Sequence, residues 1–241
     1  MSEPILRLQD VNKQFTVYRR SAQPIDVLEN VTFDLFPGEC LSLDGASGSG
    51  KSSILKLIFG NYCLSSGHIW CDFDGAGFKD FAAVSLRERH ALRKKYINYV
   101  SQFLKAIPRI SALDVVVQAG RNEVIRGLVT EQELIRRAQQ LLERLNIQSQ
   151  LWGLPPAIFS GGEQQRINLA RGLISSKPLL LLDEPSASLD HQNTQVVIEL
   201  IQEVRASGTA MIGIFHDNLV RQALSTRSIS IQQFKPSSNI Q

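Results

Sequence analysis

The sequence predicts an α/β protein with a mostly parallel sheet and helices on both of its faces. Short apolar runs with period-two alternation, such as residues 31–35, give way to stretches in which apolar residues recur every three or four positions. After Gly172, an apolar strand at 179–182, a helical stripe over 196–204 and a second buried strand at 209–215 follow one another. Strands that alternate with helices in this way are typical of a parallel sheet.

The first third of the chain contains mainly short strands. Residues 5–8 and 31–35 alternate in polarity, and a turn at 36–39 leads to a short buried strand at 40–43. From Ser52 the period changes to that of a helix, which we expect to end near Gly60.

A helical block, at about 103–158, interrupts this pattern and is predicted to be an inserted subdomain. Its clearest helix, at 131–145, has Thr130 as the predicted N-cap and Glu133 three positions later, the pattern of a capping box. The core lobe would then comprise residues 1–102 and 159–227, followed by a short polar tail at 228–241. We expect one domain of 241 residues with this insertion.

Composition and charge exclude several classes of function. With 43% hydrophobic and 20% charged residues, the chain lies in the ordinary globular range. A net charge of +3 is too small to indicate nucleic-acid binding, which requires a clustered basic face. The densest basic run is predicted to be a solvated helix face, with a partner surface as the alternative; it comprises Arg87, Arg89, Arg93, Lys94 and Lys95.

Cysteine usage and hydropathy favour a cytoplasmic protein. The three cysteines, Cys40, Cys63 and Cys71, are odd in number and form no Cys-x-x-Cys pair, which argues against a disulfide framework or a zinc site. The N-terminus lacks the long apolar stretch of a signal peptide, and no apolar run is long enough to enter a membrane directly. Any membrane role would therefore depend on another protein.

A phosphate-binding loop follows the buried strand at 40–43. Residues 45–52 fit the pattern G-x-x-x-x-G-K-[ST], in which backbone N–H groups surround phosphates. Lys51 would reach the β- and γ-phosphates, and the Ser52 hydroxyl would bind Mg²⁺. With the next residue included, the predicted ATP-binding set is Gly45, Ala46, Ser47, Gly48, Ser49, Gly50, Lys51, Ser52 and Ser53.

Further candidate residues follow the predicted strands at the edge where ligands of parallel sheets bind. Asp183 and Glu184 end the strand at 179–182, so that Asp183 would support Mg²⁺ and Glu184 would orient or deprotonate the attacking water. His216 ends the next strand and would hydrogen-bond the transferring phosphoryl group. Gln102, after the strand-like residues 99–101, would reach either the Mg²⁺ or the water.

A second anion cradle occurs about a hundred residues after the first. Ser160, Gly161 and Gly162 lead directly into a helix, whose first N–H groups have no internal partner and attract anions. The order of the pieces is 45–52, Gln102, 160–164, 183–184, 188–190 and His216. In this order and spacing the chain resembles the ATP-binding-cassette (ABC) ATPases over nearly its whole length.

The resemblance implies a function for the second cradle. In that family two copies form a head-to-tail dimer, and each ATP contacts the phosphate loop of one subunit and the second cradle of the other. It implies ATP and Mg²⁺ as cofactors, an N-terminal antiparallel β-subdomain, a homodimer or ABC heterodimer, and a role for Asp190 in communication between the two sites. The implied in-trans set is Ser160, Gly161, Gly162, Glu163 and Gln164.

The resemblance also suggests an aromatic residue that stacks on adenine. Phe15 fits the family spacing, with Tyr18 as the alternative, and either residue could equally be packed on the strand surface. Phe215 departs from the family pattern, because many relatives have a small hydroxylic residue before the histidine. We do not expect this departure to abolish hydrolysis.

Within the family, residues 99–104 and 107–116 look like the L component of the bacterial phosphonate carbon–phosphorus lyase system. That resemblance implies phosphonate lyase core subunits and a second ABC ATPase, the K component, as partners, in the synthesis of a ribose 1-alkylphosphonate 5-triphosphate. One alternative is the ATPase of a membrane transporter of the phosphonate or lipoprotein type. Another is a nucleotide-gated clamp with negligible turnover, which Glu184 and His216 argue against.

Overall fold

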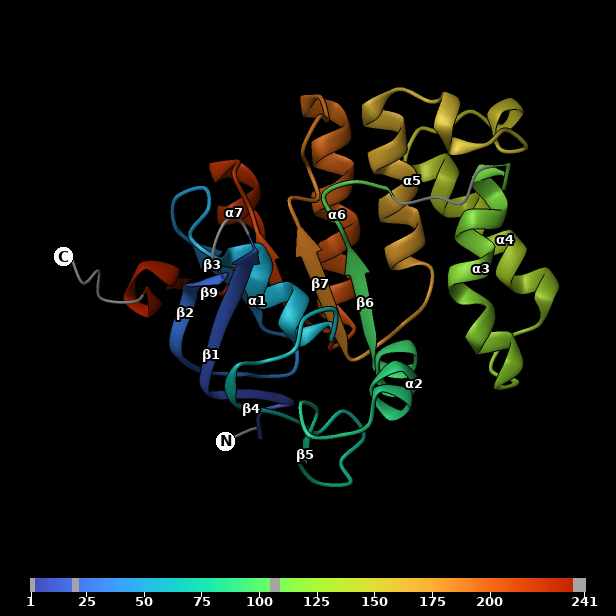
Figure 1. Ribbon diagram of the computed structural model, residues 1–241. Helices are drawn as coiled ribbons and strands as arrows, with labels where there is room; N and C mark the ends of the chain where they lie inside the picture. Colours follow the sequence, from blue (N-terminus) through green and yellow to red (C-terminus); the bar gives the residue numbers. More distant parts are fainter. Residues whose placement is uncertain (1–2, 19–21, 105–108, 236–241) are drawn as a thin grey trace.

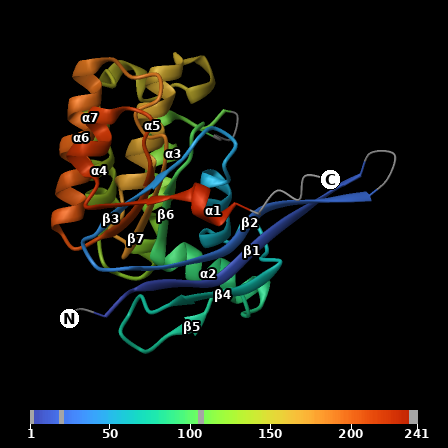
Figure 2. The ribbon, with the colours of Figure 1, turned by 90° about the vertical axis from the view of Figure 1, so that its left-hand side faces the viewer.

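The computed structural model describes residues 3–18, 22–104 and 109–235, and contains two sheets and a set of helices (Figure 1). The first sheet is antiparallel, in the order β2-β1-β4-β5. Its strands are β1 (Leu6–Tyr18), β2 (Ala22–Leu35), β4 (Ser66–Cys71) and β5 (Lys79–Asp80). Figure 2 shows β1 and β2 extending beyond the other elements as a two-stranded arm.

The second sheet is parallel throughout, in the order β6-β7-β8-β3-β9. Its strands are β6 (Ile97–Val100), β7 (Leu179–Asp183), β8 (Ala210–Ile214), β3 (Cys40–Asp44) and β9 (Arg227–Ser230). The predicted α/β class, with its parallel core sheet and antiparallel N-terminal sheet, is therefore confirmed.

Helices cover both faces of the parallel sheet. The structure contains α1 (Lys51–Ile58), α2 (Leu86–Tyr96), α3 (Ala112–Ile125), α4 (Glu131–Arg144), α5 (Gly161–Leu173), α6 (His191–Ala206) and α7 (Asn218–Leu224). Short 3₁₀ turns in the described part of the chain are η1 (Ser149–Leu151), η2 (Pro156–Ile158) and η3 (Ile231–Phe234). Of these elements, α3, α4, η1 and η2 fall within the range predicted for the helical insertion, and α3 and α4 lie to one side of the parallel sheet (Figure 1).

The alternation of side chains along β7 explains how one strand supports two cores. Leu179 and Leu181 pack in the core shared with α1 and the antiparallel sheet, whereas Leu180 and Leu182 pack in the core shared with α3, α4, α5 and α6. A strand buried on both faces must be apolar at every position, which is why β7 consists of four leucines before Asp183.

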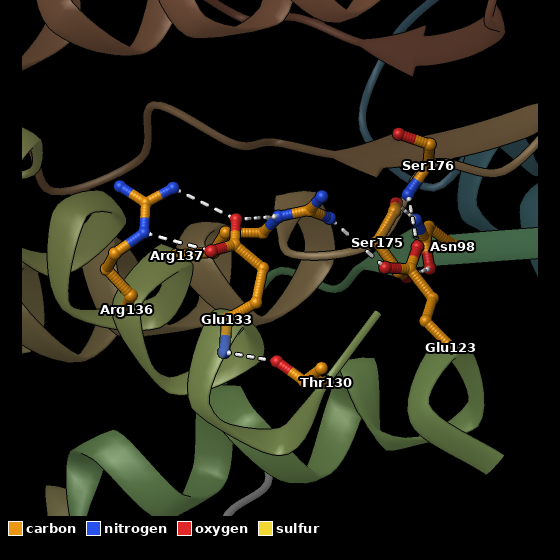
Figure 3. A network of polar contacts seen from close by, with 8 residues as sticks. All are labelled: Asn98, Glu123, Thr130, Glu133, Arg136, Arg137, Ser175 and Ser176. Carbon is orange, nitrogen blue, oxygen red and sulfur yellow. Dashed lines mark hydrogen bonds and ion pairs between the residues drawn. The ribbon is translucent and has the colours of Figure 1, made fainter. Parts of the chain in front are cut away.

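One predicted capping box is only half formed. The Thr130 hydroxyl accepts a hydrogen bond from the Glu133 N–H, as expected for the N-cap of α4. The Glu133 carboxylate, however, accepts hydrogen bonds from Arg136 and Arg137, one turn further along α4 (Figure 3). Two guanidinium groups within reach are stronger partners for a carboxylate than one backbone N–H.

The basic run lies on α2, where Arg87, Lys94 and Lys95 are exposed, as predicted for a solvated face. Arg89 and Arg93 are partly buried, because Arg89 donates to the Ala82 carbonyl and Arg93 lies over the Phe59 ring. Among the described residues, no helix is both long and apolar enough to cross a membrane.

Candidate functional site

The phosphate loop connects β3 to α1, as its sequence pattern requires. Gly50 immediately precedes α1 at φ 100°, in the left-handed region, and a Cβ at this position would lie 2.8 Å from Leu28 Cδ2. Glycine therefore allows the loop to turn sharply into the helix. Lys51 is only 8% exposed, and its Nζ donates to the carbonyls of Gly45 at 2.6 Å and Ala46 at 2.9 Å. The lysine thus braces the loop that it belongs to.

Asp183, at the carboxyl end of β7, is 4% exposed and accepts two hydroxyl hydrogen bonds. Ser52 Oγ donates to Asp183 Oδ1 at 3.0 Å, and Tyr99 Oη donates to Asp183 Oδ2 at 2.9 Å. Burial, followed by the charge of Asp183, raises the pKa of Tyr99 above its ordinary value, so Tyr99 is a hydrogen-bond donor at neutral pH. These contacts fix the carboxylate opposite the Ser52 hydroxyl.

The donor set fits Mg²⁺. Ser52 and Asp183 supply two hard oxygen ligands side by side, and Mg²⁺ in nucleotide sites uses one or two protein oxygens together with water and phosphate. Across the described part of the chain, no cluster of three or more His, Cys, Asp or Glu side chains is arranged to hold a metal alone. The phosphates of a nucleotide would therefore have to complete the coordination.

Glu184 is held between two side chains that the sequence also singles out. Gln102 Nε2 donates to Glu184 Oε2 at 3.0 Å, and His216 Nε2 lies 2.8 Å from Glu184 Oε1. Of the two expectations for Gln102, this geometry favours the one in which it positions water, since its amide lies against Glu184. Glu184 and His216 line a cavity of about 240 Å³ together with residues 47–53 of the loop and helix.

The backbone at Glu184 is unusual, because a residue with a side chain occurs at φ 55°. Gln165 on α5, 4% exposed, donates through Nε2 to the carbonyls of Pro185 at 3.1 Å and Glu184 at 3.4 Å and so supports this turn. The Glu184 N–H also donates to the Ile214 carbonyl of β8 at 3.1 Å. The direction of the carboxylate is thus set by the main chain as well as by its partners.

The second cradle is formed by the start of α5, with Ser160 as its N-cap. Here the capping box is complete: the Glu163 N–H donates to Ser160 Oγ at 3.4 Å, and Glu163 Oε2 accepts from Ser160 N at 2.9 Å and Ser160 Oγ at 2.7 Å. These hydrogen bonds from Ser160 lower the pKa of Glu163. A carboxylate therefore already binds at the position where the sequence predicts an anion, and it comes from the same helix.

Other residues that the sequence singled out lie in or near this second cradle. Gln164 Nε2 donates to the Phe159 carbonyl at 2.9 Å, and Gly162 packs so closely that an added Cβ would lie 2.9 Å from the Ser188 carbonyl oxygen. Asp190 is the N-cap of α6 and accepts from the N–H of Asn193 at 2.8 Å. None of residues 160–164 is among the described residues that line the 240 Å³ cavity beside the phosphate loop.

Phe15 on β1 lines that same cavity. Its ring meets Tyr62 edge-on at 5.2 Å, and Lys13 Nζ lies 4.5 Å from its centroid. The side chain of the alternative, Tyr18, lies outside the described residues.

Sequence reasoning missed three side chains that support the site: Tyr99, Gln165 and Asn168. Asn168 on α5 is fully buried and donates to the Ser101 carbonyl just before Gln102. Its signal in the sequence is weak, because a polar residue among apolar helical positions indicates a buried hydrogen bond without identifying the partner.

Fold and site together define a nucleoside triphosphatase of the phosphate-loop class. The phosphate loop, the carboxylate pair and the flanking Gln102 and His216 all lie at the carboxyl edge of one parallel sheet. The chain belongs to the ABC transporter family, whose characteristic region it matches over residues 28–187.

Known proteins resemble the chain over most of its length. The lipoprotein-releasing system ATP-binding protein LolD of Pseudomonas syringae pv. tomato is 35% identical over 207 residues, 85% of this chain and 87% of the relative. The macrolide export ATP-binding/permease protein MacB of Escherichia coli O157:H7 is 31% identical over 230 residues, 95% of this chain but only 33% of the relative. The chain therefore spans about one third of that second relative.

Solved structures share the fold. A dimeric structure of the ATP-binding cassette MJ0796, in a post-hydrolysis state bound to ADP and Pi, matches with a TM-score of 0.81 and 26% identity, covering 95% of this chain and 94% of that one. LolD and MacB, whose names describe lipoprotein release and macrolide export, favour the transporter alternative over the phosphonate-lyase interpretation.

Proposed function

We propose that the chain is an ATP-hydrolysing ABC subunit that acts as a head-to-tail dimer. The observation that carries this proposal is the position of Glu184, held between Gln102 and His216 beside the phosphate loop. A glutamate placed in this way can accept a proton from water, and a positioned general base is worth about 10²–10⁴ in rate.

Binding of ATP would use the loop first. Lys51 Nζ would turn from the carbonyls of Gly45 and Ala46 to the β- and γ-phosphates, while the backbone N–H groups of the loop surround the same phosphates. Ser52 and Asp183 would hold Mg²⁺, which neutralises the charge that develops on the phosphates. Phe15 would stack on adenine, and Lys13 would then have to leave the ring face that it approaches.

Glu184 would next accept the proton of the attacking water. Gln102 would orient that water from one side, and His216 would donate through Nε2 to the transferring phosphoryl group from the other. Both side chains already lie beside Glu184, and His216 Nε2 would turn from Glu184 Oε1 to the phosphoryl group when ATP binds.

The second cradle would complete the site of a partner copy. A γ-phosphate oxygen from the other subunit would replace Glu163 Oε2 on the N–H and hydroxyl of Ser160. The structure of MJ0796 is described as dimeric and supports this arrangement by similarity. Closure of the dimer would exclude bulk water from the site and add hydrogen-bond donors in the same step. Asp190 would take part in communication between the two ATP sites.

Mixing two inactive variants tests the composite site. Lys51→Ala removes the phosphate-binding lysine, and Ser160→Arg blocks the second cradle, so neither protein alone should turn over ATP. In a head-to-tail mixed dimer, one of the two sites combines an intact loop with an intact cradle. An equal mixture should therefore recover about one quarter of the wild-type rate, since half of the dimers are mixed and each has one working site. If the mixture stays inactive although mixed dimers form, the composite site is refuted.

For the work that hydrolysis drives, we propose coupling to a membrane permease. The support is similarity to LolD and MacB, whose names describe lipoprotein release and macrolide export. The second candidate is association with soluble phosphonate lyase subunits and a second ABC ATPase, supported by the resemblance of residues 99–104 and 107–116 to the L component.

Co-purification separates the two candidates. The tagged Glu184→Gln variant, captured with Mg²⁺ and ATP from cells grown on phosphonate or on phosphate, should bring down a polytopic permease under both conditions if the first proposal is right. Capture of soluble phosphonate lyase subunits without a permease would refute that proposal and support the second.

A further inference from the structure

A second cavity, of about 610 Å³, lies along β6, the edge strand of the parallel sheet. One end reaches Ser52 and Asp183, and thus belongs to the ATPase site. The lining also includes Asn98, Arg171 and Lys177, which the proposed ATPase mechanism does not use. A volume of this size accommodates a small organic molecule.

Arg171 and Lys177 are both half-buried and lack a carboxylate partner. No ion pair joins either side chain to an acid within residues 3–18, 22–104 and 109–235. Arg171 donates to the amide oxygen of Asn168 at 2.7 Å, and Lys177 Nζ donates to the Ile97 carbonyl at 3.2 Å. Both partners are neutral, so these two partly buried cations have no ion-pair partner among the described residues, and removing a charge from water without such a partner is costly.

Glu123 is the carboxylate that raises the pKa of Lys177, and both of its oxygens already accept hydrogen bonds from other groups. Glu123 Oε1 accepts from the Ser176 N–H at 3.1 Å, and Oε2 accepts from Arg137 at 3.4 Å (Figure 3). Burial lowers the pKa of Lys177 to about 8, with Lys94 lowering it further and Glu123 opposing the shift. Burial also lowers the pKa of Arg171. Glu123 thus offsets the charge of Lys177 only at a distance, since the ion pair of Glu123 among the described residues is with Arg137.

The two cations mark opposite ends of one strand. Lys177 is tied to Ile97 at the start of β6, whereas Arg171 is tied through Asn168 to Ser101 at its end. Four residues of strand separate these anchors by about 13 Å. Lys56 on α1 adds a third cation to the lining, and Phe59 and Phe103 add apolar surface. A matching ligand thus has negative charge and an apolar body.

We propose that this cavity binds a small organic phosphate monoester, with its dianionic group paired to Lys177 or Arg171 and its organic body against the aromatic side chains. Such a group carries a charge of about −1.5 to −2 at pH 7 and accepts several hydrogen bonds, as uncompensated ammonium and guanidinium groups require. This cavity shares Ser52 with the cavity of the phosphate loop, but Arg171 and Lys177 line the larger cavity alone.

Phenyl phosphate is the probe, because it combines a dianion with an aromatic body. Protein saturated with Mg²⁺ and ADP, so that the phosphate loop is occupied, is titrated by calorimetry. We expect saturable binding to the wild type, weakened at least about tenfold by Lys177→Met, since a hydrogen bond to a charged group is worth that much or more. Arg87→Met, which removes an exposed cation of α2 that does not line the cavity, is the control and should bind like the wild type.

Two further measurements establish where the probe binds and whether Lys177 is needed for folding. Lys51→Ala should retain phenyl phosphate binding. If this variant loses that binding, the probe binds at the phosphate loop and the proposal is overturned. Without the probe, Lys177→Met should melt at the same temperature as the wild type or higher, because it removes a buried charge while keeping most of the side-chain volume. A lower melting temperature would make Lys177 structural. Absence of saturable binding to the wild type at millimolar probe would equally refute the site.

Discussion

The hydrogen bond from Tyr99 to Asp183 leads to a prediction that separates positioning from packing. Tyr99→Phe removes the hydroxyl that donates to Asp183 Oδ2 at 2.9 Å. It keeps the ring, whose centroid lies 4.9 Å from that of Phe59. Asp183 would retain its Ser52 hydrogen bond, but its second oxygen would lose the donor that fixes its direction.

The size of the effect follows from the surroundings of Asp183. A hydrogen bond to a charged group contributes about 1.5–3 kcal/mol. The 610 Å³ cavity reaches Asp183, so water can replace the hydroxyl and the loss falls at the lower end, about 1.5 kcal/mol. For a chain of this size that lowers the melting temperature by roughly 3–6 °C. Loss of a group that orients a metal ligand typically weakens metal affinity about 10–100-fold.

The assay is ATPase rate against Mg²⁺ concentration at saturating ATP. Tyr99→Phe should raise the Mg²⁺ concentration at half-maximal rate at least about tenfold, and excess Mg²⁺ should restore most of the rate. Tyr96→Phe is the matched control, because Tyr96 also donates to an aspartate, Asp74, but away from the site. Should Tyr99→Phe need no more Mg²⁺ than Tyr96→Phe, the hydroxyl of Tyr99 does not position the metal ligand, and its proposed role is refuted.

Three other predictions concern single side chains. Glu184→Gln should lower turnover about 10²–10⁴-fold and trap an ATP-bound dimer, seen by size exclusion; normal turnover would show that Glu184 is not the base. Lys51→Ala should weaken ATP binding in equilibrium titrations, and an unchanged affinity would contradict its phosphate contact. Burial raises the pKa of Cys40 and Cys71 to about 12, so both thiols stay protonated at pH 8. A thiol reagent should therefore label the exposed Cys63 alone until denaturant is added. Labelling of either buried cysteine in the native state would contradict the described packing.

Local patterns predicted the sheet and its edge well. The run of leucines before Asp183 has one physical cause, a strand covered on both faces, and the loop with Lys51 needs a strand before it and a helix after it. The approach of Gln102 and His216 to Glu184 follows from parallel strands that end at one edge.

Choices between competing partners could not be predicted in the same way. Thr130–Glu133 and Ser160–Glu163 have the same S/T-x-x-E spacing, yet only the second forms a complete capping box. The difference is the presence of Arg136 and Arg137 one turn beyond Glu133, against the single Arg166 after Glu163. The role of Tyr99 was equally hidden, because its partner is 84 residues away in sequence.

The left-handed backbone at Glu184 has a consequence for how the protein could change under selection. A residue with a Cβ in this conformation costs about 1–2 kcal/mol relative to an ordinary one, a cost that glycine would relieve. Screening variants for heat resistance alone would therefore reward replacement of the glutamate that we propose as the proton acceptor. Thermal tolerance and turnover oppose each other at this one position, and a library selected for both should keep glutamate there while it gains stability elsewhere.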